Sequence, residues 1–139
     1  MKDRFLRILI LLFLIATFNC SEDNPVGSEA DKYYGVWTWM KTVGGIFPTV
    51  REPENGDIIK IYFDDNEIFK LVKNDSIKVF SKYIVEEKEN EWDRITYSNI
   101  KTYNYYFNPS INYTQLKSDT LIIWDGYMDG YFSFYKRVY

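Results

Sequence analysis

From residue 33 to the end of the chain, short apolar runs alternate with clusters of turn-forming residues, and this spacing constrains the fold more than any other feature. Asp64-Asp65-Asn66 and Lys73-Asn74-Asp75 are two such clusters, and Asn and Asp tolerate the backbone conformations of tight turns. No window of about 11 residues carries the apolar stripe of an amphipathic helix. The runs are rich in Ile, Val, Tyr and Phe, which favour strands. This part of the chain is therefore predicted to be all-β.

The runs predict eight strands. Seven cover residues 34–43, 57–63, 67–73, 76–86, 94–98, 120–124 and 131–138, and one more covers either 103–107 or 111–116. Apolar side chains alternate along them, as in Ile59, Ile61 and Phe63, so each strand has a face to bury. Sequential antiparallel strands of this number favour a closed up-and-down barrel, which has no exposed edge. A two-sheet sandwich is the structural alternative.

Composition argues against several functions. A chain of 139 residues favours a single domain, and a net charge of −3 argues against a general attraction to nucleic-acid phosphates. The chain has no His and one Cys, so it lacks the commonest general base and the thiols of a disulfide or a multi-thiolate zinc site. Nothing pairs a nucleophile with a base. We therefore expect no enzyme activity, no metal and no cofactor.

The first 19 residues have the layout of an export signal. Lys2, Arg4 and Arg7 precede an apolar run over residues 8–16. This run is shorter than the roughly 20 apolar residues that a membrane-spanning helix needs. It ends just before Cys20, which is the only cysteine in the chain.

The junction at Cys20 resembles the lipobox of bacterial lipoproteins. Strict lipoboxes place a small residue before the cysteine, whereas Asn19 stands here, and this looser form resembles bacteroidete-type lipoproteins. The resemblance implies that residues 1–19 are removed and that Cys20 becomes an acylated N-terminus. Several acyl chains on one residue would anchor the protein firmly, because each buried methylene contributes about 0.8 kcal/mol.

The residues after Cys20 are polar. Ser21, Glu22 and Asp23 resemble the signal that sends such lipoproteins to the outer face of the outer membrane. Residues 20–32 as a whole are predicted to be a flexible tether. The expected location is therefore the outer membrane, through a lipid anchor, with exposure at the cell surface.

Both ends of the predicted barrel carry a second resemblance. Gly35-Val36-Trp37 and Arg137 resemble the lipocalin superfamily, in which a first-strand Trp packs at one barrel end under an Arg from the far end of the chain. The wider pattern resembles small bacteroidete lipocalin-like lipoproteins, with a W-x-W strand running into G-G-I, a D-T-L strand, an acidic Gly turn and a Tyr-x-Arg strand. The matching positions are Trp37, Trp39, Gly44, Gly45, Ile46, Asp119, Thr120, Leu121, Tyr135 and Arg137. The resemblance covers residues 33–139 and implies an eight-stranded lipocalin-like barrel, without naming a ligand.

The candidate site residues lie on the first and last predicted strands or, for Tyr139, just after the last. Trp37, Trp39, Tyr135, Arg137 and Tyr139 are expected either to pack at a barrel end or to contact a ligand. Arg137 and Tyr139 also form an R-x-Y that resembles the carboxylate-holding pair of fatty-acid-binding proteins. Aromatic side chains could line a cavity or fill the barrel, and the sequence leaves both possibilities open.

Two further features concern the outside of the barrel. Ser76 and Thr120 each follow an Asp and precede an apolar residue, a pattern that resembles the O-glycan acceptor of exported bacteroidete proteins and also suits the start of a strand. Residues 46–56 form a long connection for a small domain, and such loops often carry function or cover an open end.

These expectations combine into one interpretation with three parts: a signal peptide over 1–19, a lipidated cysteine and tether over 20–32, and a barrel over 33–139. The barrel is expected to be a monomer that binds a small hydrophobic or amphipathic molecule. The alternative is a surface interaction module with a filled barrel, which presents loops 46–56 and 99–118 to a protein or glycan partner.

Overall fold

The computed structural model of the protein describes residues 30–47, 49–88, 92–105 and 112–139. These residues form one turn of 3-10 helix, η1 (Asp31–Tyr33), and nine strands. The strands are β1 (Gly35–Gly44), β2 (Thr49–Arg51), β3 (Ile59–Phe63), β4 (Ile68–Lys73), β5 (Ser76–Glu86), β6 (Asp93–Thr102), β7 (Asn112–Lys117), β8 (Thr120–Trp124) and β9 (Tyr131–Val138). Among the described residues, no helix is long and apolar enough to cross a membrane.

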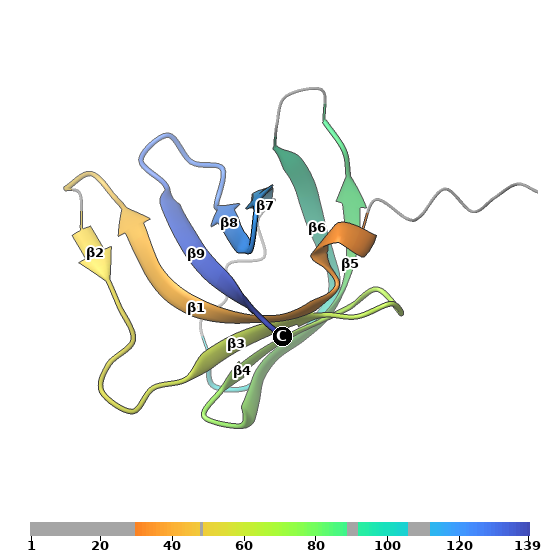
Figure 1. Cartoon of the computed structure of the whole chain (residues 1–139), viewed down its shortest axis with the longest axis horizontal. Helices are drawn as coiled ribbons and strands as arrows, with labels where there is room; N and C mark the ends of the chain where they lie inside the picture. Colours follow the sequence, from red (N-terminus) through yellow and green to blue (C-terminus); the bar gives the residue numbers. More distant parts are fainter. Residues whose placement is uncertain (1–29, 48, 89–91, 106–111) are drawn as a thin grey trace, which may run out of the picture.

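Eight of these strands close into a barrel (Figure 1). β1 and β3 to β9 are hydrogen-bonded in chain order, every pairing is antiparallel, and β9 pairs back onto β1. The predicted all-β, eight-stranded up-and-down barrel is confirmed, and the sandwich is excluded. β5, β8 and β9 have the predicted bounds. Of the two segments proposed for the strand before β8, the second is close to the observed β7.

The ninth strand corrects the sequence prediction, because residues 46–56 were expected to be a loop. β1 has 10 residues and β3 has five, so β3 pairs only with the beginning of β1. β2 pairs with the overhanging end of β1, through Thr42↔Arg51, Val43↔Val50 and Gly44↔Thr49. A short strand thus covers a backbone edge that would otherwise be exposed.

The turns after β1 and after β8 touch each other. Gly44 has φ +144°, and a Cβ atom built on it would lie 2.2 Å from the carbonyl oxygen of Gly130, so only glycine fits. The Gly45 N–H also donates a hydrogen bond to the carbonyl oxygen of Gly130, at 3.4 Å. The two turns therefore form one rim at this end of the barrel.

A β-bulge decides which side chains of β1 face inward. The register against β9 shifts between Trp39 and Lys41, so that Met40 is one residue extra. Trp37 and Trp39 face the interior before the bulge, and Thr42 joins Trp39 in the interior after it. Met40 itself is half exposed.

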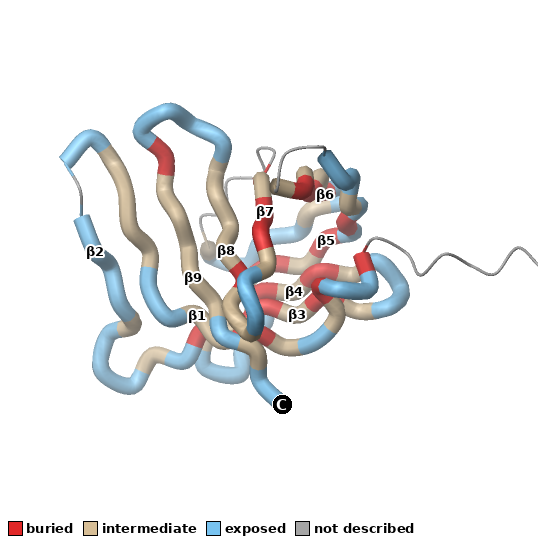
Figure 2. The backbone as a smooth tube through the Cα atoms, turned by 45° about the horizontal axis from the view of Figure 1, so that its top comes forward, coloured by how far each residue is buried: buried red, intermediate tan, exposed pale blue. Residues whose placement is uncertain are grey.

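The two ends of the barrel are filled differently. Figure 2 shows the buried residues concentrated on β3 to β7, whereas β2 and the adjoining parts of β1 and β9 are exposed or half-buried. The interior toward β3–β6 is packed with rings: Phe63 lies 5.2 Å from Phe69 and 4.9 Å from Tyr83, and Phe69 lies 5.0 Å from Tyr97, measured between ring centres. Such tilted contacts are favourable for aromatic pairs.

Candidate functional site

The helical turn η1 seals one end of the barrel, which we call the closed end. Its last residue, Tyr33, is 1% exposed and continues the line of interior rings, with its ring centre 6.3 Å from that of Phe63. Ala30, the residue just before η1, is also buried. Ala30, which the sequence places in the predicted tether, is therefore buried against the barrel, whereas Asp31 and Lys32 are exposed.

Arg137 joins the end of the last strand to this seal. Its guanidinium carbon lies 4.1 Å from the ring centre of Trp37. Its Nη1 and Nη2 atoms each donate a hydrogen bond of 2.7 Å, to the carbonyl oxygens of Tyr34 and Lys32. The Trp37 indole N–H donates to the carbonyl oxygen of Tyr33 at 2.8 Å. These hydrogen bonds fasten η1 and the residue after it to β1 and β9.

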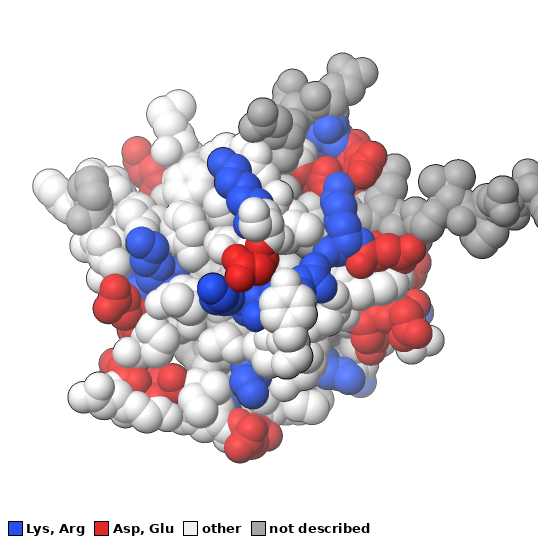
Figure 3. Space-filling model, in the orientation of Figure 1, with Lys and Arg blue, Asp and Glu red and all other residues white. Residues whose placement is uncertain are grey.

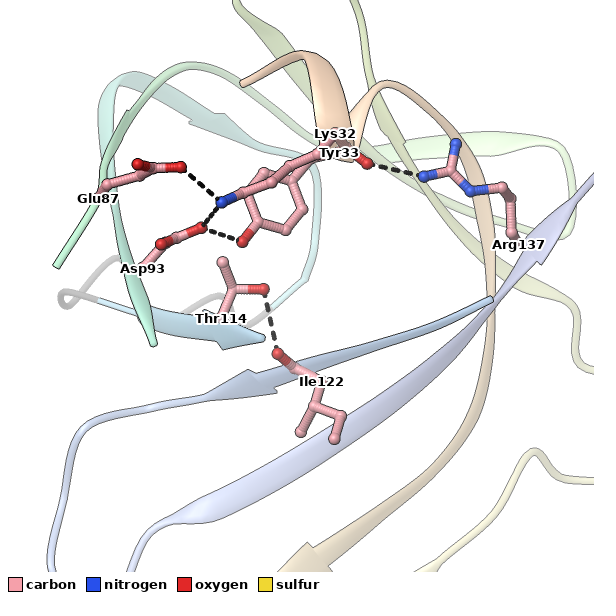
Figure 4. A network of polar contacts seen from close by, with 7 residues as sticks. All are labelled: Lys32, Tyr33, Glu87, Asp93, Thr114, Ile122 and Arg137. Carbon is pink, nitrogen blue, oxygen red and sulfur yellow. Dashed lines mark hydrogen bonds and ion pairs between the residues drawn. The ribbon is translucent and has the colours of Figure 1, made fainter. Parts of the chain in front are cut away.

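A charged network lies beside the same seal (Figure 4). The Tyr33 hydroxyl donates to the carboxylate of Asp93, and the Lys32 ammonium lies 2.6 Å from Asp93 and 2.9 Å from Glu87. Burial, followed by the hydrogen bond and charge of Asp93, raises the pKa of Tyr33. Burial acts to lower the pKa of Lys32, but the hydrogen bonds and charges of Asp93 and Glu87 outweigh it, so the net shift is upward.

A hollow of about 500 Å³ lies over this network, lined by Lys32, Tyr33, Glu87, Lys88, Asp93, Gln115 and Leu116. Although it is large, it is shallow, and its central charges are already paired with one another. A ligand here would have to compete with those ion pairs. The closed end is therefore the weaker candidate for a binding site.

The opposite end, which we call the open end, contains a deeper pocket of about 250 Å³. Ile59 and Leu71, both almost fully buried, line its apolar part. The remaining lining residues are Trp39, Thr42, Arg51, Tyr105, Tyr131, Ser133 and Tyr135. Pockets of this kind, apolar and aromatic with a few polar groups, are typical of small-molecule sites.

The polar groups inside the pocket are ordered. The Trp39 indole N–H donates to the Thr42 hydroxyl at 3.0 Å, and that hydroxyl lies 2.8 Å from the hydroxyl of Ser133. Burial is the main cause that raises the pKa of Tyr135, followed by the nearby Tyr105. Tyr135 therefore keeps a neutral hydroxyl group at physiological pH.

The five candidate residues on the first and last strands fall in three places. Trp37 and Arg137 lie at the closed end, directly opposite each other in the β1–β9 pairing. Trp39 and Tyr135 are the next inward pair and line the open-end pocket. Tyr139 is 96% exposed. Because Arg137 is engaged with Trp37 and with two carbonyl oxygens, the R-x-Y pair does not form a carboxylate site inside the barrel.

The remaining candidates lie outside the pocket. Ser76 is exposed at the start of β5, and Thr120 is half-buried at the start of β8, where its hydroxyl faces Asp119 at 3.4 Å. Both positions suit a strand start, and their glycosylation stays a prediction. The lipidation residue Cys20 and the export residues Ser21, Glu22 and Asp23 lie outside the described residues.

Sequence reasoning did not single out most of the pocket. Arg51 comes from the unpredicted strand β2, and Tyr105 lies just after β6. One part of the pocket could have been found from the sequence. Tyr131, Ser133 and Tyr135 alternate along the last predicted strand, so they share one face, and that face lines the pocket.

The described part of the chain was also compared with the requirements of a metal site and of a nucleic-acid surface. Among the described residues, no group of three or more His, Cys, Asp or Glu side chains could hold a metal ion. On the face shown in Figure 3, acidic and basic side chains are interspersed, and neither sign forms a broad patch. The open-end pocket is therefore the best candidate site.

The chain was compared with known protein families, curated proteins and solved structures. Neither the family models, nor the curated proteins, nor the solved structures that were searched contain a match to this chain.

Proposed function

We propose that the protein is a lipid-anchored outer-membrane protein whose lipocalin-like barrel binds a small hydrophobic or amphipathic molecule. The observation that carries the binding function is the open-end pocket of about 250 Å³, with Ile59 and Leu71 in its apolar part and aromatic side chains in its walls. The filled closed end supports the same function, because it leaves one entrance for a ligand.

The lipocalin-like character rests on two kinds of support. The first is the pattern of motifs at both ends of the chain. The second is the contact of Arg137 with Trp37, which has the geometry that the resemblance implies. An eight-stranded antiparallel barrel is compatible with that family.

The anchor rests on Cys20 and on the apolar run before it. Ala30, ten residues further along, is buried beside the closed end, and ten residues can reach at most about 35 Å. An anchor at Cys20 would therefore keep the closed end within about 35 Å of the bilayer. Cys20→Ala should abolish incorporation of labelled fatty acid in the producing cell; labelling that survives would refute the anchor.

A binding panel tests the pocket, with the full chain in solution or, if it is membrane-bound, in lipid nanodiscs. Fatty acids, aromatic acids and hydrophobic dyes are titrated against the wild type, Ser133→Leu and Lys136→Leu. Leu at 133 fills the pocket, whereas Lys136 lies on the outer face of the same strand. We expect at least one compound to bind and Ser133→Leu to weaken it about tenfold or more, a loss of about 1.4 kcal/mol, with Lys136→Leu as the unchanged control.

The second candidate function is the surface interaction module. It is favoured by apolar side chains at the rim of the open end: Ile46 is 77% exposed, Phe47 81% and Met128 100%. These residues come from the two turns that touch through Gly44 and Gly130. If no compound binds the folded protein, the pocket function fails and the interaction module becomes the better explanation.

A further inference from the structure

The open-end pocket carries one positive charge at its edge. Among the described residues that line the pocket, Arg51 is the only cationic side chain, and no carboxylate lines the pocket with it. β2 places Arg51 there, because its pairing with Thr42 brings it beside a pocket residue of β1. The strand outside the barrel closure thus contributes the charged group of the described lining.

The charge of Arg51 is not neutralised by an ion pair among the described residues. Its guanidinium carbon lies 5.2 Å from the ring centre of Tyr131, a cation–π contact that leaves its N–H groups available. By contrast, Lys32, Lys73 and Lys136 each have a carboxylate within 3.2 Å. Asp129 lines the neighbouring rim groove together with Arg51, but it forms no ion pair with it.

The size of the pocket limits what can accompany an anionic group. Its volume of about 250 Å³ is below the roughly 300–1,000 Å³ of sites that enclose drug-sized ligands. The walls include the flat rings of Trp39, Tyr105 and Tyr135. A planar ring or a short branched chain fits such a space, whereas most of a long acyl chain would stay in water.

Resting on the proposed binding function, we propose that the pocket selects a compact amphipathic carboxylate. The carboxylate pairs with Arg51 at the mouth, and its apolar body lies against Trp39 and between Ile59 and Leu71. An Arg–carboxylate pair is favourable because two parallel N–H donors match the two oxygens. The aromatic walls then favour a ring over a chain.

The test compares two ligands that share one ring system and differ in whether the attached group is charged. Naphthoate and its neutral amide, naphthamide, are titrated by calorimetry against the full chain, with palmitate as the long-chain probe and naphthalene sulfonate as a second anion. Naphthoate should bind about tenfold more tightly than naphthamide, and its affinity should fall as salt is added. The sulfonate distinguishes a carboxylate site from a site for any anion.

Variants of the basic residues separate charge from shape. Arg51→Gln should remove the preference for naphthoate over naphthamide, and Arg51→Lys should restore part of that preference. Lys41→Gln is the matched control. Lys41 is next to Thr42, the residue that pairs with Arg51, but its side chain lies over the outward ring of Phe134. Thermal melting of each variant checks that the fold is retained.

Three outcomes would overturn the proposal. Equal binding of naphthoate and naphthamide, or an equal loss of both in Arg51→Gln, would remove the role of Arg51 while leaving the binding function intact. Tighter binding of palmitate or of the sulfonate than of naphthoate would refute the compact carboxylate. Binding of none of the four to the folded protein would defeat the pocket function as well.

Discussion

At the scale of single residues, Arg137 connects the end of the chain to the start of the barrel. It stacks on Trp37 and donates hydrogen bonds to the carbonyl oxygens of Tyr34 and Lys32. Without it, these carbonyl groups lose a charged donor and the outer face of the indole loses its cover. The closed end therefore depends on one side chain that comes from the last strand.

Arg137→Ala should lower the free energy of unfolding by about 2–3 kcal/mol, since hydrogen bonds from a charged donor contribute about 1.5–3 kcal/mol and a cation–π contact about 0.5–2 kcal/mol. Arg137→Lys should recover only part, because an ammonium cannot reproduce the planar pair of donors. Urea denaturation measures both. Lys136→Ala, on the exposed face of the same strand, is the control and should cost less than about 1 kcal/mol. An Arg137→Lys protein as stable as the wild type would contradict this role.

Residues of the candidate site differed in how far the sequence could identify them. Trp39 and Tyr135 could be proposed, because each belongs to a short motif, W-x-W or Tyr-x-Arg, that is visible in the sequence. Arg51 could not, since its place in the pocket depends on β2 folding back along β1. β2 has only three residues, too few for a strand pattern to be recognised in the sequence.

At the scale of elements, strand positions follow from local pattern, whereas strand faces do not always do so. The alternation of Ile59, Ile61 and Phe63 correctly predicted a buried face, because β3 is regular. Simple alternation along β5 would place Ile77 on the same face as Val79, yet Ile77 is 46% exposed and Val79 is fully buried. The register against β4 shifts between these two residues.

The bulge at Met40 also changes which side chains face inward, and here the change affects the lining of the pocket. Simple alternation would place Lys41 inside after Trp39, but the extra residue brings Thr42 inward instead. Thr42 then bonds the Trp39 indole and faces Ser133. A bulge is an extra residue in one strand relative to its partner, so the sequence of either strand alone does not reveal it.

At the scale of the whole molecule, one barrel combines a filled end with an open one. The aromatic content of 19% could not distinguish these outcomes, because the same residue types do both. Tyr33, Phe63, Phe69 and Tyr83 fill the closed end, while Tyr105, Tyr131 and Tyr135 surround space at the other. The difference arises from η1, which closes one end, and from the overhang of β1, which widens the other.

The buried tyrosines also predict how the whole barrel responds to alkali. Burial is the main cause that raises the pKa of Tyr33, Tyr83 and Tyr97 above the ordinary value of 10.0. The folded protein therefore holds these phenolic protons more tightly than the unfolded chain does. Their stabilisation is complete below about pH 10 and is lost as the pH rises toward the folded pKa, with a slope of at most about 1.4 kcal/mol per pH unit for each tyrosine.

Denaturation curves recorded from about pH 8 to pH 12 should thus show a free energy of unfolding that falls only above pH 10. Tyr83→Phe removes one titrating group and should give a shallower fall, although loss of its hydrogen bond to the carbonyl oxygen of Asp64 should cost about 1 kcal/mol at neutral pH. Tyr139→Phe, at an exposed position, should follow the wild type. A free energy of unfolding that stays level above pH 10, or an equal slope in Tyr83→Phe, would mean that these rings are not sealed from water as the closed end requires.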